Sequence, residues 1–417
     1  MSNPETPDAA AVEPPGAVAS HHEDAVAQRT ARTAVLRTPA VQLPYLAHFD
    51  RRLQASLVGA MHAGERAELS AHQATLGQSF VGAVLAIERG ETATVDAILR
   101  VAESQPAVAR GLISACGWLS PQLLRGHANT LLQSTVPLRR WLGIAACAQH
   151  RVNPAAALDE CIAHPHPLLR CMALRAAGQL GRIDLLGAIS KQLDDNDPAC
   201  RQAAAWSAVL LGDRSAGLQK LHAIALSAES NSSEALQLSL LAAEPDVSRA
   251  LVRQLVAASA PVSTTLRAAS WAGDVQVVPW LIKHMADDRN ARLAGEAFSF
   301  ITGANLVKLD LDRTGTPPAD VPGEHVAYDD TLPWPDPDAV RAWWLRQARF
   351  LPHDVRCFSG APVSQSICQA VLISAGQQQR YSAALLKSLT NPGTPLFNVA
   401  APAHRQERLL NLPQSAQ

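Results

Sequence analysis

A repeat of about 31 residues is the feature that most constrains this chain of 417 residues. Segments that start at Pro137, Pro167 and Pro198 resemble one another: each carries an arginine three residues after the proline, followed by small apolar residues. We call the residue that closes each segment the breaker. The breakers recur at steps of 30 to 33 residues over 186 residues, at Gly117, His150, Gly181, Gly212, Ala243, Gly273 and Gly303. Repeats of this length stack on their neighbours, which predicts a solenoid.

The prolines and glycines within each repeat indicate where helices begin and end. Asp197 before Pro198 is an N-cap followed by proline at the first helical position, where its missing N–H costs nothing. Gly181 and Gly212 stand where a first helix should end, and a second apolar segment follows each of them. Hydrophobic residues make up 47% of the chain but aromatic residues only 4%, a core chemistry that favours helices. The predicted fold is all-α, an α-solenoid of helix pairs.

Shifts in composition divide the chain into five parts. The first part lacks apolar periodicity, which predicts disorder, while the second has apolar residues at helical spacing. The predicted parts are a disordered tail at 1–34, an N-terminal helical cap at 35–79, the solenoid at 80–305, an Asp/Pro-rich connection at 306–337 and a C-terminal helical region at 338–417.

Two resemblances follow from these motifs. Asp197-Pro198 with Arg201, small residues and Gly212-Asp213 resembles a short bacterial HEAT repeat. On a larger scale, the chain is similar over about 36–410 to an uncharacterised bacterial HEAT-containing family. The segments that carry this similarity are LRTPAVQLPYLAHFDRRLQASLVGAMHAG (36–64), GEAFSFITGANL (295–306), LPWPDPDAVRAWW (332–344), QQQRYSAALLKSL (377–389) and PGTPLFNVAAPAHRQ (392–405). The resemblance implies a gene context near components and cargo of the type VI secretion system, without a mechanism.

Charge and composition exclude several classes of partner. The formal net charge is −1, so no electrostatic footprint for nucleic acid appears in the total. The apolar stretches are far shorter than the ~20 residues a membrane span needs. The seven cysteines are odd in number and lack a CxxC pair, which suits a reducing compartment. Because the N-terminus also lacks the features of a signal peptide, we expect a cytoplasmic protein without membrane insertion.

Two clusters could suggest a metal site. The first comprises Cys161, His164, His166 and Cys171. Its spacing matches no common zinc motif, so we interpret the cysteines as small packed side chains. In the second, Asp310, Asp312 and Gly315 match an EF-hand loop, but Val321 stands where the closing glutamate belongs. We interpret this segment as an acidic surface loop and expect no metal.

Motifs for catalysis and cofactors are missing too. The only His-Glu dipeptide is His22-Glu23, whereas HEAT-repeat di-iron enzymes need several such pairs. No GxSxG, Walker A or GxGxxG motif occurs. We therefore predict no catalytic residues and no cofactor.

Three sets of residues remain as candidates for partner binding. Arg140, Arg170 and Arg201 share one repeat position; they either line a concave groove or, as we favour, bind an aspartate or a helix end of a neighbouring repeat. Lys191 and Lys283 lie ten residues after their breakers, with Lys220 about half a turn away. If second helices face the concave side, these lysines form a basic stripe that attracts an acidic partner; ordinary solvated lysines are the alternative we favour.

The third set is aromatic. Trp334, Trp343 and Trp344 either dock the C-terminal region on the last repeat, which we favour, or contact a partner. A solenoid with such surfaces predicts a non-catalytic protein-binding scaffold. With the family resemblance, this becomes an adaptor, chaperone or assembly factor for a secretion component or secreted toxin. The alternatives are a cofactor-loading helper, as in bilin-lyase-like HEAT proteins, and a structural oligomer subunit.

Overall fold

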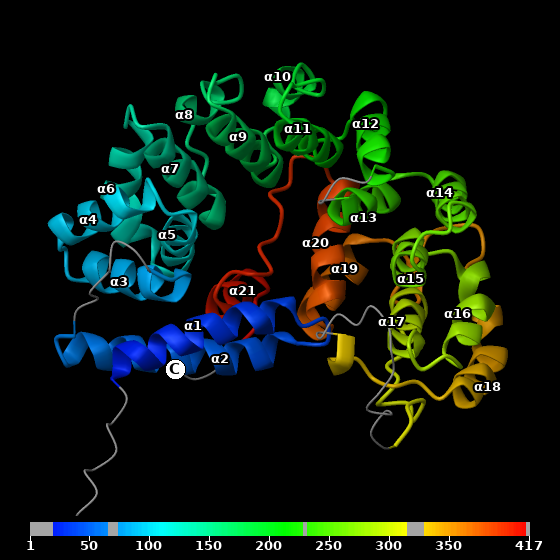
Figure 1. The fold of residues 1–417 in the computed structure, drawn as a ribbon. Coiled ribbons are helices and arrows are strands. Elements are labelled where there is room, and N and C mark those ends of the chain that lie inside the picture. The colour runs from blue at the N-terminus through cyan, green and yellow to red at the C-terminus, as the bar shows by residue number, and fades with distance from the viewer. Residues whose placement is uncertain (1–19, 66–73, 228–231, 315–328, 414–417) are drawn as a thin grey trace, which may run out of the picture.

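The computed structural model describes residues 20–65, 74–227, 232–314 and 329–413, and its helices form the predicted all-α solenoid (Figure 1). Helices alternate between an inner and an outer row of an arc. The inner row comprises α3 (Leu76–Glu88), α5 (Pro106–Trp118), α7 (Pro137–His150), α9 (Pro167–Leu180), α11 (Pro198–Leu210), α13 (Ser232–Ala242), α15 (Val262–Ala272) and α17 (Ala291–Thr302). The outer row comprises α4 (Thr92–Ala102), α6 (Pro121–Leu132), α8 (Ala156–Asp159), α10 (Leu186–Ser190), α12 (Ala216–Ala225), α14 (Pro245–Ala257), α16 (Val278–His284) and α18 (Pro337–Gln347).

The residues expected to start and end the helices largely do so. The Asp197 carboxylate accepts a hydrogen bond of 2.9 Å from the backbone N–H of Cys200, which caps α11. Gly181 and Gly273 end α9 and α15 in the left-handed conformation, with φ of 69° and 68°. Gly117 differs, because it lies in the last turn of α5 and not beyond the helix. Short 3₁₀ turns, η1 (Ile183–Leu185) and η2 (Val275–Val277), lead into α10 and α16.

The inner helices are buried on nearly all sides. In α11, every residue from Gln202 to Leu210 is buried, and Trp206 is fully enclosed. Small residues let the neighbouring inner helix approach closely, so that the Ser207 hydroxyl donates a hydrogen bond of 2.7 Å to the carbonyl oxygen of Leu174 in α9. A helix that is apolar all round must be covered on both faces. Here the outer row covers one face, and other parts of the chain cover the concave one.

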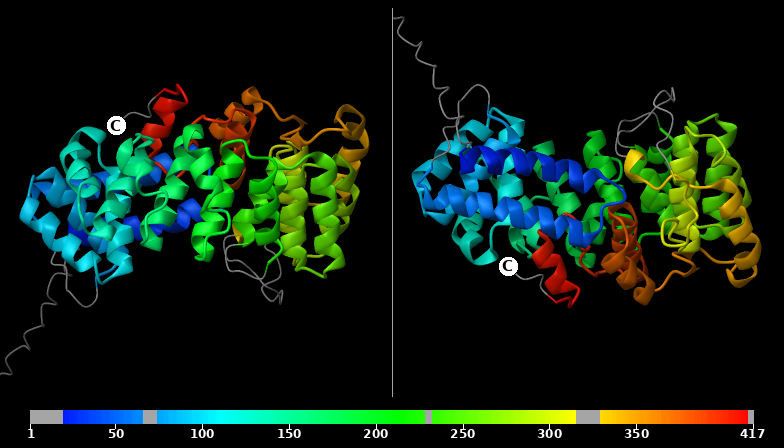
Figure 2. Two further views of the ribbon diagram at one scale, coloured as in Figure 1. Left: turned by 90° about the horizontal axis from the view of Figure 1, so that it is seen from above. Right: turned by 90° about the horizontal axis from the view of Figure 1, so that it is seen from below.

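The first of these parts is an N-terminal helix pair, α1 (His21–Arg37) and α2 (Leu43–His62), which crosses the opening of the arc (Figures 1 and 2). The predicted disordered tail at 1–34 is therefore wrong for residues 21–34; residues 1–19 lie outside the described part. Ser20 and Glu23 form a capping box that starts α1. The apolar pattern is hidden because two arginines, Arg29 and Arg32, occupy its buried face.

The second part is the C-terminal region, which returns along the inside of the arc (Figure 1). After α18 come η4 (Ala348–Phe350), the two-residue strands β1 (Cys357–Phe358) and β2 (Ala361–Pro362), which pair antiparallel, then α19 (Gln365–Ser374), α20 (Gln377–Thr390) and α21 (Ala403–Leu409). Helix α20 packs on α11 and α13, and α21 packs on α2. We name residues 391–402, which lack regular secondary structure between α20 and α21, the strap. The predicted connection at 306–337 carries η3 (Asp329–Thr331) where it is described.

The returning chain contacts the breakers at the ends of the inner helices. The amide N–H of Cys357 donates to the carbonyl oxygen of Gly273 at 2.8 Å, and the amide of Leu396 in the strap donates to Gln179 at 2.9 Å. At Gly181, a Cβ atom would lie 2.2 Å from the carbonyl oxygen of Gly393. The glycines of the repeat therefore serve twice, since they end helices and also leave room for the returning backbone.

Arginines reinforce the same contacts. Arg356 donates hydrogen bonds to the carbonyl oxygens of Leu241 and Ala243 at the end of α13, and Arg405 donates to Gly117 and Leu119 at the end of α5. Cations are favourable at helix C-termini because carbonyl groups there lack partners within the helix. The concave face is thus an internal interface of this chain.

Candidate functional site

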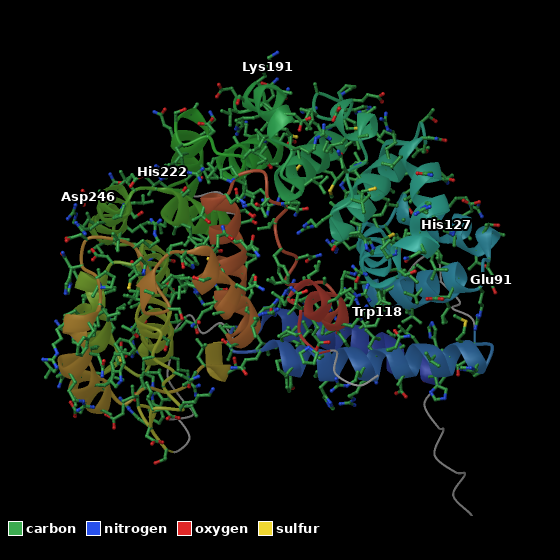
Figure 3. The ribbon with its side chains drawn as sticks, turned by 180° about the vertical axis from the view of Figure 1, so that it is seen from behind. Glu91, Trp118, His127, Lys191, His222 and Asp246 are labelled. Carbon is green, nitrogen blue, oxygen red and sulfur yellow. The ribbon has the colours of Figure 1, made fainter. Side chains whose placement is uncertain are left out.

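The lysine stripe lies on the other side of the solenoid from the one predicted. Lys191 directly follows α10 and Lys283 lies in α16, both helices of the outer row, and both side chains are exposed. Figure 3 shows Lys191 at the outer edge of the arc. Lys220, in α12, makes an exposed ion pair of 2.5 Å with Asp194. The premise that second helices face the concave side is wrong, because the first helices and the C-terminal region fill that side.

The repeated arginines have structural partners, as the favoured interpretation predicts. Arg170 makes a bidentate ion pair with Asp195, with N–O distances of 2.5 and 2.9 Å, which links α9 to the turn before α11. Arg201 donates to the carbonyl oxygen of Asp195, and Arg140 pairs with Glu160 at 3.0 Å. Asp195 therefore links Arg170 to Arg201 of the next repeat, whereas Arg140 binds Glu160 within its own repeat.

The two metal candidates differ in how much of each is described. No three His, Cys, Asp or Glu side chains within the described ranges are arranged to hold a metal ion. Cys161 is buried in the core, and the Cys171 thiol points to the carbonyl oxygen of Ala199 at 3.6 Å. The loop with Asp310 and Asp312 continues into 315–328, and its closing position, Val321, lies outside the described residues.

The tryptophans pack within the chain. Trp343, in α18, meets Phe298 of α17 edge to face, with ring centroids 5.6 Å apart. The Arg313 guanidinium lies over the Trp334 ring at 4.6 Å. Trp344 is half-buried against the core. These contacts match the docking interpretation, in which the aromatic residues hold α18 on the last repeat.

Beside them lies a surface that sequence reasoning missed. We name it the terminal face; it comprises Arg341, Leu345, Arg346, Arg349 and Phe350 on α18 and η4. Leu345 is 75% exposed and Phe350 68%, the highest values among the large hydrophobic residues described. Arg349 lies over the Phe350 ring at 4.7 Å. The signal was present in the sequence WWLRQARF (343–350): once the two tryptophans turn inward, the leucine and the second arginine must face outward.

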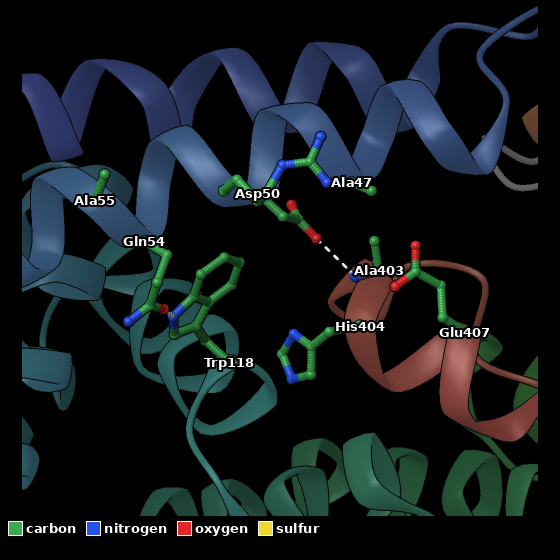
Figure 4. A pocket seen from close by; sticks show the side chains of 9 residues that line it. Ala47, Asp50, Gln54, Ala55, Trp118, Ala403, His404 and Glu407 are labelled. Carbon is green, nitrogen blue, oxygen red and sulfur yellow. Dashed lines mark hydrogen bonds between the residues drawn. The ribbon is translucent and has the colours of Figure 1, made fainter. Parts of the chain in front are cut away.

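A second candidate is the junction where the arc closes (Figure 4). A cavity of about 410 Å³ lies between α2, the end of α5 and α21. Trp118 and His404 face one another across it, and the Trp118 indole N–H donates to Gln54 at 3.2 Å. Burial, and then the charge of the neighbouring Arg405, lowers the pKa of His404, which keeps the imidazole neutral at pH 7.

An ion pair joins the segments at this junction. Arg32 of α1 donates to Asp50 of α2 at 2.6 Å, and both side chains are more than 90% buried. Asp50 also accepts the first N–H of α21, from Ala403, at 2.7 Å (Figure 4). Arg32 reaches the carbonyl oxygens of Ala400 and Ala401 in the strap at 3.3 Å. Four segments from both ends of the chain thus meet at one buried ion pair.

Comparison with known proteins supports the repeat. Residues 154–240 match a family described as HEAT repeats. The chain contains HEAT repeats. It matches no curated protein and no solved structure. None of the helices in the described part is long and apolar enough to cross a membrane.

Proposed function

We propose that this HEAT-repeat protein is a non-catalytic protein-binding scaffold that holds its partner on the terminal face. The observation that carries the proposal is the exposure of Leu345 and Phe350 beside three arginines, on a helix whose opposite side is packed on the solenoid. HEAT solenoids usually bind partners on the concave side. In this chain that side is occupied by α20, the strap and α21, so binding falls to an outer surface.

The chemistry of the terminal face selects the partner. Leu345 and Phe350 offer apolar area, while Arg346 and Arg349 add positive charge within one turn. Arg341 is partly neutralised by Asp338 at 2.8 Å. Aromatic residues and arginine are the groups that most often contribute strongly to interfaces. The partner that fits is a protein segment with an apolar stripe and flanking carboxylates, such as an acidic amphipathic helix.

The experiment is capture by the tagged full-length protein, compared between variants. Leu345→Ser with Phe350→Ser should abolish capture of the specific partner, and Arg346→Glu with Arg349→Glu should weaken it more at low salt than at moderate salt. The matched control is Leu409→Ser, since Leu409 of α21 is 61% exposed but lies elsewhere. Equal capture by the folded Leu345/Phe350 variant and by the control would refute the terminal face as the binding site.

Charge reversal of the outer lysines separates the competing surface. If Lys191→Glu with Lys283→Glu abolishes capture while the terminal-face variants leave it intact, the partner binds the outer row of the solenoid.

Within the proposal, the finer role is that of an adaptor, chaperone or assembly factor for a type VI secretion component or its cargo. The family resemblance at 295–306, 332–344, 377–389 and 392–405 supports this role. Identification of the captured protein by mass spectrometry tests it, and a partner unrelated to secretion would contradict it.

A further inference from the structure

A second cavity at the junction is lined by several side chains that carry hydrogen-bond donors. Its volume is about 230 Å³, and it lies between α1, α5, the end of α7 and the strap. Three arginines line it: Arg29 and Arg32 from α1, and Arg110 from α5. None of the described residues that line it is acidic. The cavity thus collects positive charge in a protein whose overall charge is close to zero.

Arg29 is the unusual member. It is only 8% exposed, and among the described residues it contacts no carboxylate. Its Nε donates to the Ser114 hydroxyl at 2.8 Å, its Nη2 donates to the same oxygen, and its Nη1 donates to Thr33 at 2.7 Å. The guanidinium carbon lies over the Phe80 ring, 5.2 Å from the ring centroid. A guanidinium has five N–H donors, so two remain for a ligand.

The charge of Arg29 persists despite its burial. Burial, and then the charge of Arg32, lowers the pKa of Arg29 to about 10, which leaves the group protonated at neutral pH. Asp50 balances only one charge, because both of its oxygens are already bound by Arg32 and by the Ala403 amide. A buried cation without a counter-charge is costly, and an anion in the cavity would relieve that cost.

Two neutral groups add donors at the same place. The Ser114 oxygen accepts two N–H groups from Arg29, so its own O–H is left to donate. The Gln149 side-chain oxygen accepts from Asn398 of the strap at 3.1 Å, which leaves the amide NH₂ of Gln149 for the cavity. Arg110 is exposed and stands on the open side. A water molecule takes about 30 Å³ of liquid, so the cavity has room for an anion of several atoms.

We propose that this cavity binds a small oxyanion, a carboxylate or phosphate, between Arg29 and Arg110, with Ser114 and Gln149 as further donors. The bound anion touches α1, α5 and α7 and lies against the strap. It therefore holds the closed form of the molecule, since opening of the junction would separate its ligands. Binding at this cavity is independent of the terminal face.

The test uses the full-length protein with sodium phosphate and sodium succinate as separate probes, against sodium chloride of equal ionic strength. We expect one or both probes to raise the melting temperature saturably and to give a binding isotherm by calorimetry. Saturation by phosphate alone identifies a tetrahedral oxyanion, and saturation by succinate alone a carboxylate. Loss of a charge-assisted hydrogen bond weakens binding about tenfold, so Arg110→Gln should raise the dissociation constant by that factor.

Controls keep the test falsifiable. Arg125→Gln removes an exposed arginine on α6, outside both the cavity and the terminal face, and should leave anion binding unchanged. Because Arg29→Gln can impair folding, Ser114→Ala is the second variant within the cavity, and it should weaken binding several-fold. If neither probe gives a saturable response beyond chloride, or if Arg110→Gln and Ser114→Ala bind as well as the unmodified protein, the proposal is wrong.

Discussion

Removal of the Asp50 carboxylate should destabilise the protein far more than loss of an ordinary surface charge. Asp50→Ala leaves Arg32 buried without its partner and beside Arg29, and it removes the acceptor of the Ala403 N–H. Breaking a buried, hydrogen-bonded ion pair from one side typically costs ~3–5 kcal/mol. The geometry places Asp50 at the upper end of this range, because the variant loses the ion pair with Arg32 and the hydrogen bond from Ala403 together.

Urea unfolding followed by circular dichroism measures this loss. The matched control is Asp338→Ala, whose carboxylate pairs with Arg341 at the exposed surface and should contribute less than about 1 kcal/mol. Replacing both members of the pair, by Arg32→Met with Asp50→Leu, should recover part of the loss because no buried charge remains unpaired. If Asp50→Ala loses no more free energy of unfolding than Asp338→Ala, the reasoning about the junction is wrong.

Three further predictions concern the solenoid. Gly181→Ala should lower the free energy of urea unfolding clearly more than Gly64→Ala, because only at Gly181 would the added Cβ clash with backbone, that of Gly393. Both glycines have positive φ, which costs an alanine ~1–2 kcal/mol in either variant, so equal losses would contradict the close contact. Burial raises the pKa of all seven cysteine thiols, and only Cys171 is half-buried. Ellman's reagent at pH 8 should therefore react first with Cys171 and with the others only on unfolding, and rapid reaction of all seven would contradict this. The hydrogen bond from Arg170 lowers the pKa of Asp195, so the ion pair stabilises the fold above pH ~4, and this stabilisation is lost as the pH falls through the lowered pKa. Asp195→Asn should therefore flatten the pH dependence of the urea midpoint between about pH 5 and 3, and an unchanged slope would count against the ion pair.

The repeat could be predicted because its signals are local. Proline starts, N-caps and glycine ends depend on neighbours within a few residues, and Gly181, Gly273 and Gly303 all take the left-handed conformation. Helix α1 was missed because hydrophobic periodicity counts arginine as exposed. Arg29 and Arg32 are buried through hydrogen bonds and aromatic contacts that no local pattern contains.

The orientation of the solenoid was missed for a related reason. A HEAT-like helix pair has two apolar faces, and the sequence of one repeat does not say which face another segment will cover. The covering segment is distant: the hydrogen bond from Ala403 to Asp50 spans 353 residues. One signal was available, since residues 203–211, AAAWSAVLL, which form the second half of α11 and its C-cap, have no polar stripe and thus require cover on both sides.

Hydrogen exchange across the strap tests the central claim, that the C-terminal region fills the concave face, most directly. The strap has no helix or strand of its own, so its amides can be protected only by contacts such as those from Leu396 to Gln179 and within the turn at Asn398. In the intact protein we predict slow exchange in peptides that cover 394–403, and Asp50→Ala should accelerate it at Ala403. Complete exchange of these amides within seconds in the unmodified protein would contradict the account.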